Sequence, residues 1–283
     1  MQKWAKNPKY VAAARKDGFI LQEKISGIEY AVGGWFNGKT FSRYFLQNHE
    51  YKKHLNGGLG PNTGEMGTLT MYVTECELAK RCLIPLIPQL KKIGYVGFID
   101  ASFMIKEDGT PAFMEFTMRF GYPLIHNQVA SHLGDPVMFM RDMLDGKDTL
   151  EVEVDKACIS IVMTLPPFPH HGTPLEELWG IPVYLPDNRK NIHLTQAHVA
   201  ERPQMINDKL VVKMPGIVTS GDQVLVVTGL GDTITGARKS AYSTIKKIKI
   251  PASPGYRTDI GADNLVKNLP KLQAMGYATG FKY

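Results

Sequence analysis

Two neighbouring segments, residues 96–105 and 111–120, constrain the fold of this chain most strongly. Drawn as β-strands, both carry polar side chains on one face. Alternate side chains of a strand share a face, so Glu115, Thr117 and Arg119 line up together in the second segment. The sequence therefore predicts two adjacent strands that present a common polar surface.

A turn at residues 108–109 joins these strands and sets their register. A two-residue Asp-Gly turn pairs Asp100 with Thr117. The same turn pairs Ser102 with Glu115, which lie two positions closer to it. Unpaired charges are costly to bury, so this face needs water or a ligand of opposite charge. Oxygen ligands beside an arginine suit Mg²⁺ and a phosphate chain. The alternative is an amphipathic hairpin with one solvated face.

A longer pattern begins inside this hairpin, Glu115-Phe-Thr-Met-Arg-Phe-Gly-Tyr-Pro123. It resembles the Glu-Phe-Asn-x-Arg-Phe-Gly-Asp-Pro-Glu signature of the glycinamide ribonucleotide synthetases, which are the phosphoribosylamine-glycine ligases of the ATP-grasp superfamily. Two earlier segments agree with it. Gly60-Pro-Asn-Thr-Gly-Glu-Met-Gly67 is similar to the family's Gly-Pro-Asn-Thr-Gly-Gly-Met-Gly, and Gln22-Glu-Lys-Ile-Ser-Gly-Ile-Glu29 resembles its Glu-Glu-x-Leu-x-Gly-Glu-Glu hinge.

Segments near the other end of the chain also follow the family's carboxyl-terminal pattern in order. They are Thr219-Ser-Gly221, residues 224–231, Ala237-Arg-Lys-Ser-Ala-Tyr242 and Tyr256-Arg-Thr-Asp-Ile-Gly261. A short motif alone is only a hypothesis. Collinear matches from about residue 19 to residue 261 are far more specific than any one of them.

The resemblance implies an α+β fold, with an ATP-grasp-type domain (its second lobe) at residues 1–150 and a small strand-rich carboxyl-terminal domain at residues 151–283. A complete family member also has an amino-terminal domain and a first ATP-grasp lobe. Residues 1–18 are too short to supply either, so we expect this chain to lack both. A fragment, a split subunit and a late-starting gene product all remain open.

Local patterns predict the individual elements. We expect strands at residues 19–25, 29–36, 40–46, 157–164, 224–228 and 245–250, a glycine-rich loop at 47–68, and helices at 8–16 (ending near Gly18), 75–92, 126–144 (broken at 134–136) and 235–241.

The hinge-like segment implies the ATP site. By resemblance, the residues that bracket the adenine are Gln22, Glu23, Lys24 and Ile25. Glu29 then pairs with the ribose hydroxyls. The alternative for Glu29 is a solvated charge on a strand.

The family match also implies the substrate contacts, which are Asn48, Asn62, Thr63, Gly64 and Arg257. Asn48 stands where the family has an aspartate, which removes a negative charge able to pair with the amino group of glycine. Glu65 replaces a family glycine, and its charge either repels phosphate or binds an amine. We expect Asp259 to anchor Arg257 or a turn. Structural roles are the alternative for these carboxyl-terminal residues.

The metal site implied by the resemblance lies on the polar face of the hairpin. Glu115 matches the family's Mg²⁺ ligand, and Thr117 replaces the asparagine that normally joins it. Asp100 is a hypothetical replacement ligand from across the hairpin. Arg119 is retained as the catalytic residue that holds phosphate bidentately. Tyr122 replaces an aspartate of the family pattern, which weakens the match on the substrate side.

Composition excludes some classes of protein. With 43% hydrophobic and 21% charged residues, this 283-residue chain is ordinary for a globular protein. No apolar run reaches the roughly 18 residues of a membrane span, and no hydrophobic signal region follows Met1, so we expect a cytoplasmic protein. Neither the three cysteines nor His170, His171 and His198 have metal-site spacing.

The net charge of +6 comes from short, separated pairs of basic residues that no aromatic residues interleave. This distribution disfavours nucleic-acid binding, and a basic cleft for ATP and a sugar phosphate explains it. The resemblance therefore implies an ATP- and Mg²⁺-dependent carboxylate-amine ligase of purine nucleotide biosynthesis, acting through an acyl phosphate on small-molecule substrates. The alternatives are a non-catalytic or split subunit that needs a separate chain carrying the missing half, and a basic nucleic-acid accessory protein.

Overall fold

The computed structural model describes residues 6–169, 176–262 and 264–283. Its α-helices are α2 (Pro8–Asp17), α3 (Glu77–Cys82), α4 (Ile87–Lys92), α5 (Leu124–Ser131), α6 (Pro136–Leu144), α7 (Ile234–Ile245) and α8 (Asn264–Ala274). Its strands are β1 (Ile28–Phe36), β2 (Phe41–Glu50), β3 (Lys53–Leu55), β4 (Leu59–Asn62), β5 (Gly67–Val73), β6 (Gly97–Ile105), β7 (Pro111–Thr117), β8 (Ala157–Thr164), β9 (Trp179–Val183), β10 (Ile192–Leu194), β11 (Ala197–Ile206), β12 (Lys209–Ser220) and β13 (Gln223–Gly231). Short 3₁₀ turns lie at Asn56–Gly58, Ile84–Leu86 and Glu176–Leu178.

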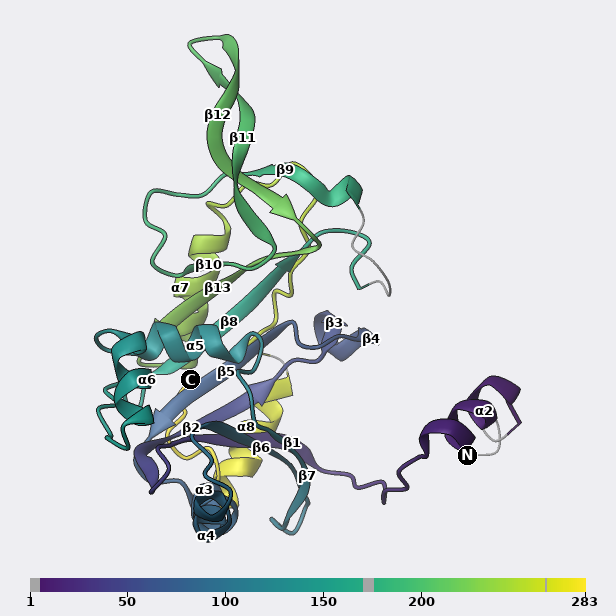
Figure 1. Cartoon of the computed structure of the whole chain (residues 1–283), viewed down its shortest axis with the longest axis vertical. Helices are drawn as coiled ribbons and strands as arrows, with labels where there is room; N and C mark the ends of the chain where they lie inside the picture. The colour runs from purple at the N-terminus through teal and green to yellow at the C-terminus, as the bar shows by residue number, and fades with distance from the viewer. Residues whose placement is uncertain (1–5, 170–175, 263) are drawn as a thin grey trace.

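An eight-stranded antiparallel sheet forms the centre of the fold, in the order β10-β13-β8-β5-β2-β1-β6-β7 (Figure 1). With its covering helices it makes an α+β fold, as expected. Strand β8 pairs with β5, so the sheet is continuous across residue 150. The division into domains at 1–150 and 151–283 remains a prediction.

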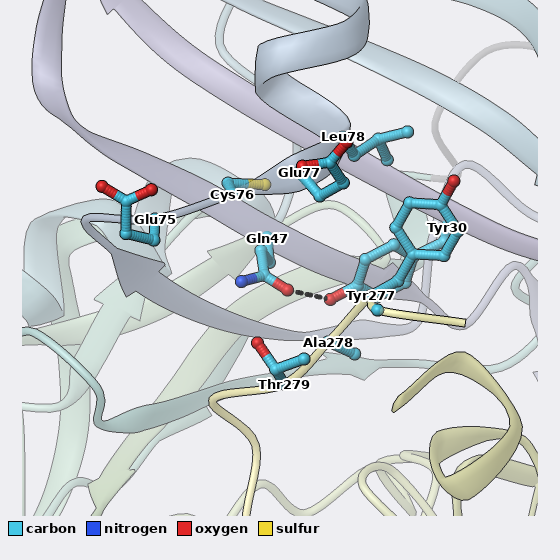
Figure 2. A pocket seen from close by; sticks show the side chains of 10 residues that line it. Tyr30, Gln47, Glu75, Cys76, Glu77, Leu78, Tyr277, Ala278 and Thr279 are labelled. Atoms are coloured by element: carbon cyan, nitrogen blue, oxygen red, sulfur yellow. Dashed lines mark hydrogen bonds between the residues drawn. The ribbon is translucent and has the colours of Figure 1, made fainter. Parts of the chain in front are cut away.

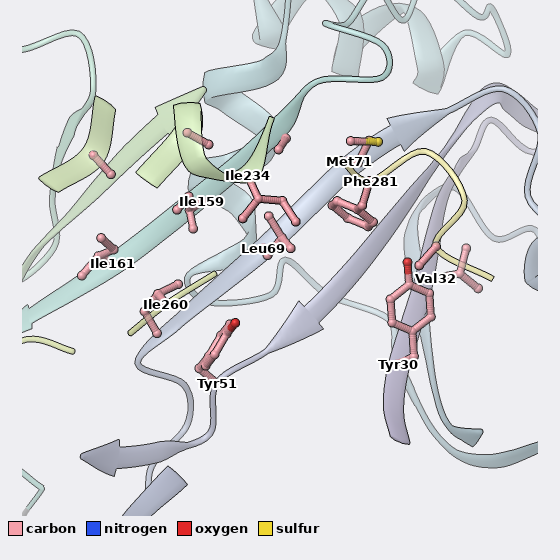
Figure 3. Close-up of a cluster of buried hydrophobic side chains, with 14 of the residues drawn as sticks. Tyr30, Val32, Tyr51, Leu69, Met71, Ile159, Ile161, Ile234, Ile260 and Phe281 are labelled. Carbon is pink, nitrogen blue, oxygen red and sulfur yellow. The ribbon is translucent and has the colours of Figure 1, made fainter. Parts of the chain in front are cut away.

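The larger hydrophobic core lies on one face of this sheet. Aliphatic and aromatic side chains from β1, β5 and β8 meet residues of α7 and of the carboxyl-terminal segment there (Figure 3). Close packing of α7 depends on Gly229, because a Cβ at this position of β13 would lie 2.4 Å from the Ala237 carbonyl oxygen. Glycine is required where a backbone approaches this closely.

The opposite face of the sheet is divided between a smaller core and a polar region. The smaller core packs Trp35, Tyr72 and Phe139 together beneath α5 and α6. The Trp35 ring meets Phe139 edge-on, with ring centroids 5.3 Å apart. The remainder of this face carries buried polar side chains, and it contains most of the candidate site described below.

The β6–β7 hairpin has the predicted register, because Asp100 pairs with Thr117 and Ser102 with Glu115. This register results from two departures from ideal hairpin geometry, a longer loop and a bulge, whose effects on the pairing offset each other. The Lys106 N–H donates to the Thr110 carbonyl oxygen, and the Lys106 carbonyl oxygen accepts from the Gly109 N–H, so the loop is one residue longer than a two-residue turn. A bulge between Ser102 and Phe103 then restores the predicted pairing.

Smaller elements extend from this sheet. Strands β11, β12 and β9 form a separate three-stranded sheet, whose β11–β12 hairpin projects at the top of Figure 1. Strands β3 and β4 form a short hairpin. Helix α2 stands at the end of an extended segment and has no buried residue (Figure 1). No helix in the described part of the chain is long and apolar enough to cross a membrane.

The sequence predicted several elements correctly. Helix α2 ends at Asp17 with Gly18 as its C-cap, the helical region at 75–92 is broken by a 3₁₀ turn into α3 and α4, and α5 and α6 are separated at residues 132–135. The predicted strands at 29–36, 40–46, 157–164 and 224–228 and the helix at 235–241 are all present, some with longer bounds.

Three sequence predictions are wrong. Residues 19–25 form no strand, because no neighbouring strand in the described chain satisfies their backbone groups. Residues 245–250 form no strand either, since α7 continues to Ile245 and a single bridge joins Lys249 to Tyr184. The expected loop at 47–68 contains the end of β2, the β3–β4 hairpin and the first residues of β5.

Candidate functional site

A hollow at the β6–β7 end of the sheet brings together two predicted site segments. It has a volume of about 420 Å³, and its lining residues are Gln22, Glu23, Ile25, Met104, Ala112, Phe113, Met114 and Glu115. Gln22, Glu23 and Ile25 come from the segment predicted to bracket adenine, whereas Glu115 is the predicted metal ligand. Residues about ninety positions apart in the sequence therefore share one cavity with apolar and acidic walls.

Inward from this hollow, Asp100 lies on β6 and Asn48 on β2, with Gly33 of β1 between their strands. Asn48 Nδ2 donates a hydrogen bond to Asp100 Oδ1 at 3.0 Å, and both side chains are buried. Glycine at position 33 makes this contact possible, because a Cβ there would lie 3.0 Å from Asp100 Oδ1 and closer still to the Phe98 ring. Burial, followed by the negative charge of Glu50, raises the pKa of Asp100 to about 7.

Lys52, which follows β2, connects two further carboxylates. Its Nζ forms ion pairs with Glu29 and with Glu50, the latter at 3.2 Å. Although burial alone disfavours a charged lysine, Glu50 and Glu29 raise the pKa of Lys52 above its ordinary value. Burial raises the pKa of Glu50, and the charge of Glu115 adds to that shift. Glu50 therefore links the hollow electrostatically to the interior of the polar face.

Glu65 is a second buried carboxylate of this region. Its side chain is 7% exposed, and its Oε1 has no hydrogen-bond partner. Burial raises its pKa well above the ordinary value, and the negative charges of Glu50 and Asp100 add to the shift. The sequence identified Glu65 as a departure from the family loop, but burial of this side chain emerges only in three dimensions.

The other predicted ATP and phosphate residues are solvent-accessible. Lys24 is exposed and has no regular secondary structure. Glu29 is the second residue of β1, is half-buried and is held by Lys52. Arg119 is exposed just beyond β7, and its Nη1 donates to the Phe120 carbonyl oxygen at 3.0 Å.

The predicted substrate loop lies beside Lys52. Asn62 is exposed at the end of β4, and Gly64 is exposed after it. Thr63 folds back onto the chain, where both its backbone N–H and its hydroxyl donate to the Lys52 carbonyl oxygen, at 2.8 and 2.9 Å. This contact holds the loop against the chain that follows β2.

Arg257 is buried and already paired. Its Nη2 and Nε donate to the Asp259 carboxylate at 2.6 and 2.7 Å, and its Nη1 donates to the Lys53 carbonyl oxygen at 3.0 Å. The guanidinium also lies over the Tyr51 ring, 5.0 Å from its centroid. The expectation that Asp259 anchors Arg257 is confirmed. Arg257 thus ties the carboxyl-terminal segment to the chain that follows β2, and its assignment as a substrate residue remains a prediction.

The donor set on this face fits a hard cation. Glu115, Thr117 and Asp100 share one face by the register of the hairpin and present only oxygen ligands. In the described residues no three His, Cys, Asp or Glu side chains gather as a metal cluster. A Mg²⁺ ion held here would therefore rely on two carboxylates and the Thr117 hydroxyl. His170 and His171 lie outside the described residues.

Sequence reasoning missed the polar contacts made by α5. Asn127 is fully buried, and its Nδ2 donates to Thr70 Oγ1 and to the Cys158 carbonyl oxygen, both at 3.0 Å. The rings of His126 and His193 stack with centroids 4.8 Å apart. No spacing in the sequence indicated these pairs, because α5, β5 and β10 are far apart along the chain.

A second cavity lies on the other side of the sheet, near the start of α3 (Figure 2). Its volume is only about 10 Å³, room for water but not for a nucleotide. Tyr30 donates to Gln47 Oε1 across it at 2.6 Å. This cavity is too small to compete with the hollow as a ligand site.

The match to a known family covers most of the residues of this site. The model of the phosphoribosylglycinamide synthetase ATP-grasp (A) domain matches residues 7–124, which contain the hollow and the polar face up to α5. The chain belongs to the phosphoribosylglycinamide synthetase family. A phosphoribosylamine–glycine ligase of Ralstonia nicotianae is 29% identical over 251 residues, covering 86% of this chain and 56% of the relative. That of Salmonella typhimurium is 30% identical over 223 residues, covering 76% of this chain and 49% of the relative.

Two solved structures share the fold of this chain. The crystal structure of phosphoribosylamine–glycine ligase from Thermotoga maritima is 25% identical with a TM-score of 0.63, covering 84% of this chain and 57% of that one. A biotin carboxylase domain from Hydrogenobacter thermophilus, in complex with MgADP and bicarbonate, has a TM-score of 0.54 at 13% identity, over all of this chain and 60% of that one. The synthetase family member described here thus has the ATP-grasp fold and spans about half the length of the curated relatives it matches.

Proposed function

We propose that this protein is an ATP- and Mg²⁺-dependent ligase that joins a carboxylate to an amine, as phosphoribosylamine–glycine ligases do in purine biosynthesis. The observation that carries the proposal is the hollow shared by Gln22, Ile25 and Glu115. It places the adenine-type segment beside the acidic end of β7. A cytoplasmic location is part of the same proposal.

The described residues have the chemistry for each step. Apolar side chains of Met104 and Met114 offer a surface for the base. Glu115 and Asp100 would hold Mg²⁺, which neutralises charge on the phosphate chain when it is bound. Phosphorylation of the substrate carboxylate then gives an acyl phosphate, which the amine attacks. Catalysis of this type rests on positioning and electrostatics, so no protein nucleophile is needed.

Thermal unfolding tests this proposal directly. A ligand that binds the native state raises the melting temperature, so Mg²⁺-ATP should stabilise the chain. Glu115→Ala should abolish most of that shift, whereas Glu107→Ala, at an acidic residue of the adjoining turn that lies outside the hollow, should leave it unchanged. No shift in the parent chain at millimolar nucleotide would contradict the proposal for the isolated chain.

A second candidate function is that of a subunit completed by a separate chain. Phe19, Ile20 and Leu21 are 78%, 85% and 73% exposed, although large apolar side chains usually gain free energy by burial. They adjoin the segment that lines the hollow. The occupant that fits this surface is the half of the ligase that matched relatives have and this chain does not cover. Binding of ATP only after addition of such an amino-terminal half would favour this alternative.

A further inference from the structure

Two basic segments that are far apart in the sequence lie side by side next to β10, at one edge of the main sheet. The backbone groups of Tyr184 and Lys249 exchange hydrogen bonds at 2.9 and 3.0 Å. This bridge places the loop at residues 185–191 beside the segment that follows α7. Together the two segments carry five exposed cationic side chains, which are Arg189, Lys190, Lys246, Lys247 and Lys249.

Ion pairs in the described part of the chain do not neutralise these cations. None of the five side chains has an ion-pair partner among the described residues. Asp187 is the one carboxylate in the sequence of the two segments. Cations after a helix interact favourably with its dipole, which accounts for Lys246 and Lys247. It does not account for Arg189 and Lys190, which belong to a loop, so the excess positive charge indicates an anionic ligand.

A hollow of about 300 Å³ lies between the two segments. Its lining residues are Pro186, Asp187, Asn188, Asn191, Thr244 and Lys247. Asparagine amides, a threonine hydroxyl and a lysine ammonium can all donate hydrogen bonds to anionic oxygens. Asn188 Oδ1 accepts from the Lys190 N–H at 3.2 Å, so the loop uses the acceptor of this amide and leaves its Nδ2 as a donor.

We propose that this hollow binds the phosphate chain of a small molecule that carries two or more phosphate groups. Lys247 and the amide and hydroxyl donors contact the chain, and the four other cations surround it. A single phosphate brings about two negative charges, which is too few to balance five cations, whereas a diphosphate or longer chain matches them. Lysine binds phosphate as a compact point charge, which suits a chain that is held from several sides.

This hollow is distinct from the proposed nucleotide site and does not depend on the proposed ligase function. Asn191 directly precedes β10, whereas Glu115 lies on β7, and these two strands form opposite edges of the eight-stranded sheet (Figure 1). Neighbouring strands are about 4.8 Å apart, so roughly 30 Å of sheet separates the two edges. A molecule bound beside β10 therefore acts as an effector and not as a reactant at β7.

Calorimetric titration of the full chain with sodium pyrophosphate, in EDTA and at constant ionic strength, tests this site. We expect saturable binding to the parent chain and an affinity about tenfold lower in Lys247→Ala, because the variant removes a charged hydrogen-bond donor. Lys91→Ala removes an exposed lysine from the last turn of α4 and is the matched control, which should bind like the parent. Orthophosphate should bind more weakly than pyrophosphate.

Equal pyrophosphate affinity in the parent and in Lys247→Ala would overturn the proposal, as would the absence of saturable binding to the parent. Binding that Arg119→Met abolishes and Lys247→Ala leaves intact would place pyrophosphate at the nucleotide hollow and also overturn it. Saturable binding of single-stranded RNA without binding of pyrophosphate would make the patch a nucleic-acid surface, and the proposal would fail.

A parallel titration with ADP identifies the source of the phosphate chain. If Lys247→Ala weakens ADP binding as well, the ligand is a nucleotide, and if it weakens pyrophosphate binding alone, the ligand is a free phosphate chain. Both results support the site. Failure of Mg²⁺-ATP to stabilise the protein would leave these outcomes unchanged, because Lys247 lies at the other edge of the sheet.

Discussion

Asn48 Nδ2 donates a hydrogen bond to Asp100 Oδ1 at 3.0 Å, across the intervening strand β1. By resemblance, the family has an aspartate at position 48, where this chain has an asparagine. The Asn48 amide is here the hydrogen-bond partner of a carboxylate on β6. Two carboxylates at this distance in a buried region would repel each other, so an aspartate at position 48 is incompatible with an ionised Asp100.

Asn48→Asp should destabilise the protein by about 3 kcal/mol at pH 8, because it places two buried carboxylates in contact. Adding Asp100→Asn should restore most of the loss by exchanging the two roles. Urea unfolding of the parent, both single variants and the double variant measures this coupling. Strict additivity of the single effects would show that the two side chains do not interact in the folded protein.

Arg257→Met should cost about 3 kcal/mol, since it leaves the Asp259 carboxylate without its buried partner. It also frees the Lys53 carbonyl oxygen. Arg141→Met on the exposed face of α6 is the matched control and should change the free energy of unfolding by no more than about 0.5 kcal/mol. Equal effects of the two substitutions would show that the Arg257 pair contributes nothing to stability.

Two glycines of the α7 region should respond to alanine with opposite signs. At Gly229 the new Cβ would lie 2.4 Å from the Ala237 carbonyl oxygen, so Gly229→Ala should destabilise by about 2 kcal/mol or more. At Gly236, inside α7, the nearest atom is Thr233 Oγ1 at 3.5 Å, and alanine should stabilise the helix by up to about 1 kcal/mol. Thermal unfolding checks both, and a stable Gly229→Ala variant would contradict the close packing of α7 on β13.

The stacked histidines should make stability depend on pH. Burial, followed by the neighbouring His193, lowers the pKa of His126 from 6.5 to about 4. Between these values the unfolded chain binds a proton that the folded chain does not, so this histidine destabilises the protein progressively as the pH falls from 6.5 towards 4.

His126→Phe keeps an aromatic ring against His193 but cannot titrate. Relative to the parent, this variant should gain about 2 kcal/mol between pH 7.5 and pH 5, as measured by urea unfolding at the two pH values. Asp100 contributes in the opposite direction, because its raised pKa favours the folded state as the pH falls through 7. This contribution is the same in the parent and in the variant, so it cancels in the difference between them. Parallel pH profiles for the parent and the variant would show that His126 titrates normally in the folded protein.

Much of the hairpin could be predicted because its information is local. Alternation in residues 111–117 and the Asp-Gly turn were enough to pair Asp100 with Thr117, although an extra loop residue and a bulge both contribute to that register. The strand predicted at residues 19–25 failed for the opposite reason. Its apolar pattern suits a strand, but a strand forms only where a neighbour accepts its backbone hydrogen bonds.

The sequence by itself determined the family, the helices α5 to α7, the hairpin and the candidate ligands Glu115 and Asp100. These features depend on patterns that span a few residues and on motifs in a fixed order. Only the tertiary structure decided which of those residues meet. Asn48 and Asp100 are 52 positions apart and Arg257 and Lys53 are 204 apart, so no local period relates them. Burial of Glu65 follows from how β2, β5 and α5 pack, because burial is a property of the assembled sheet and its covering helices.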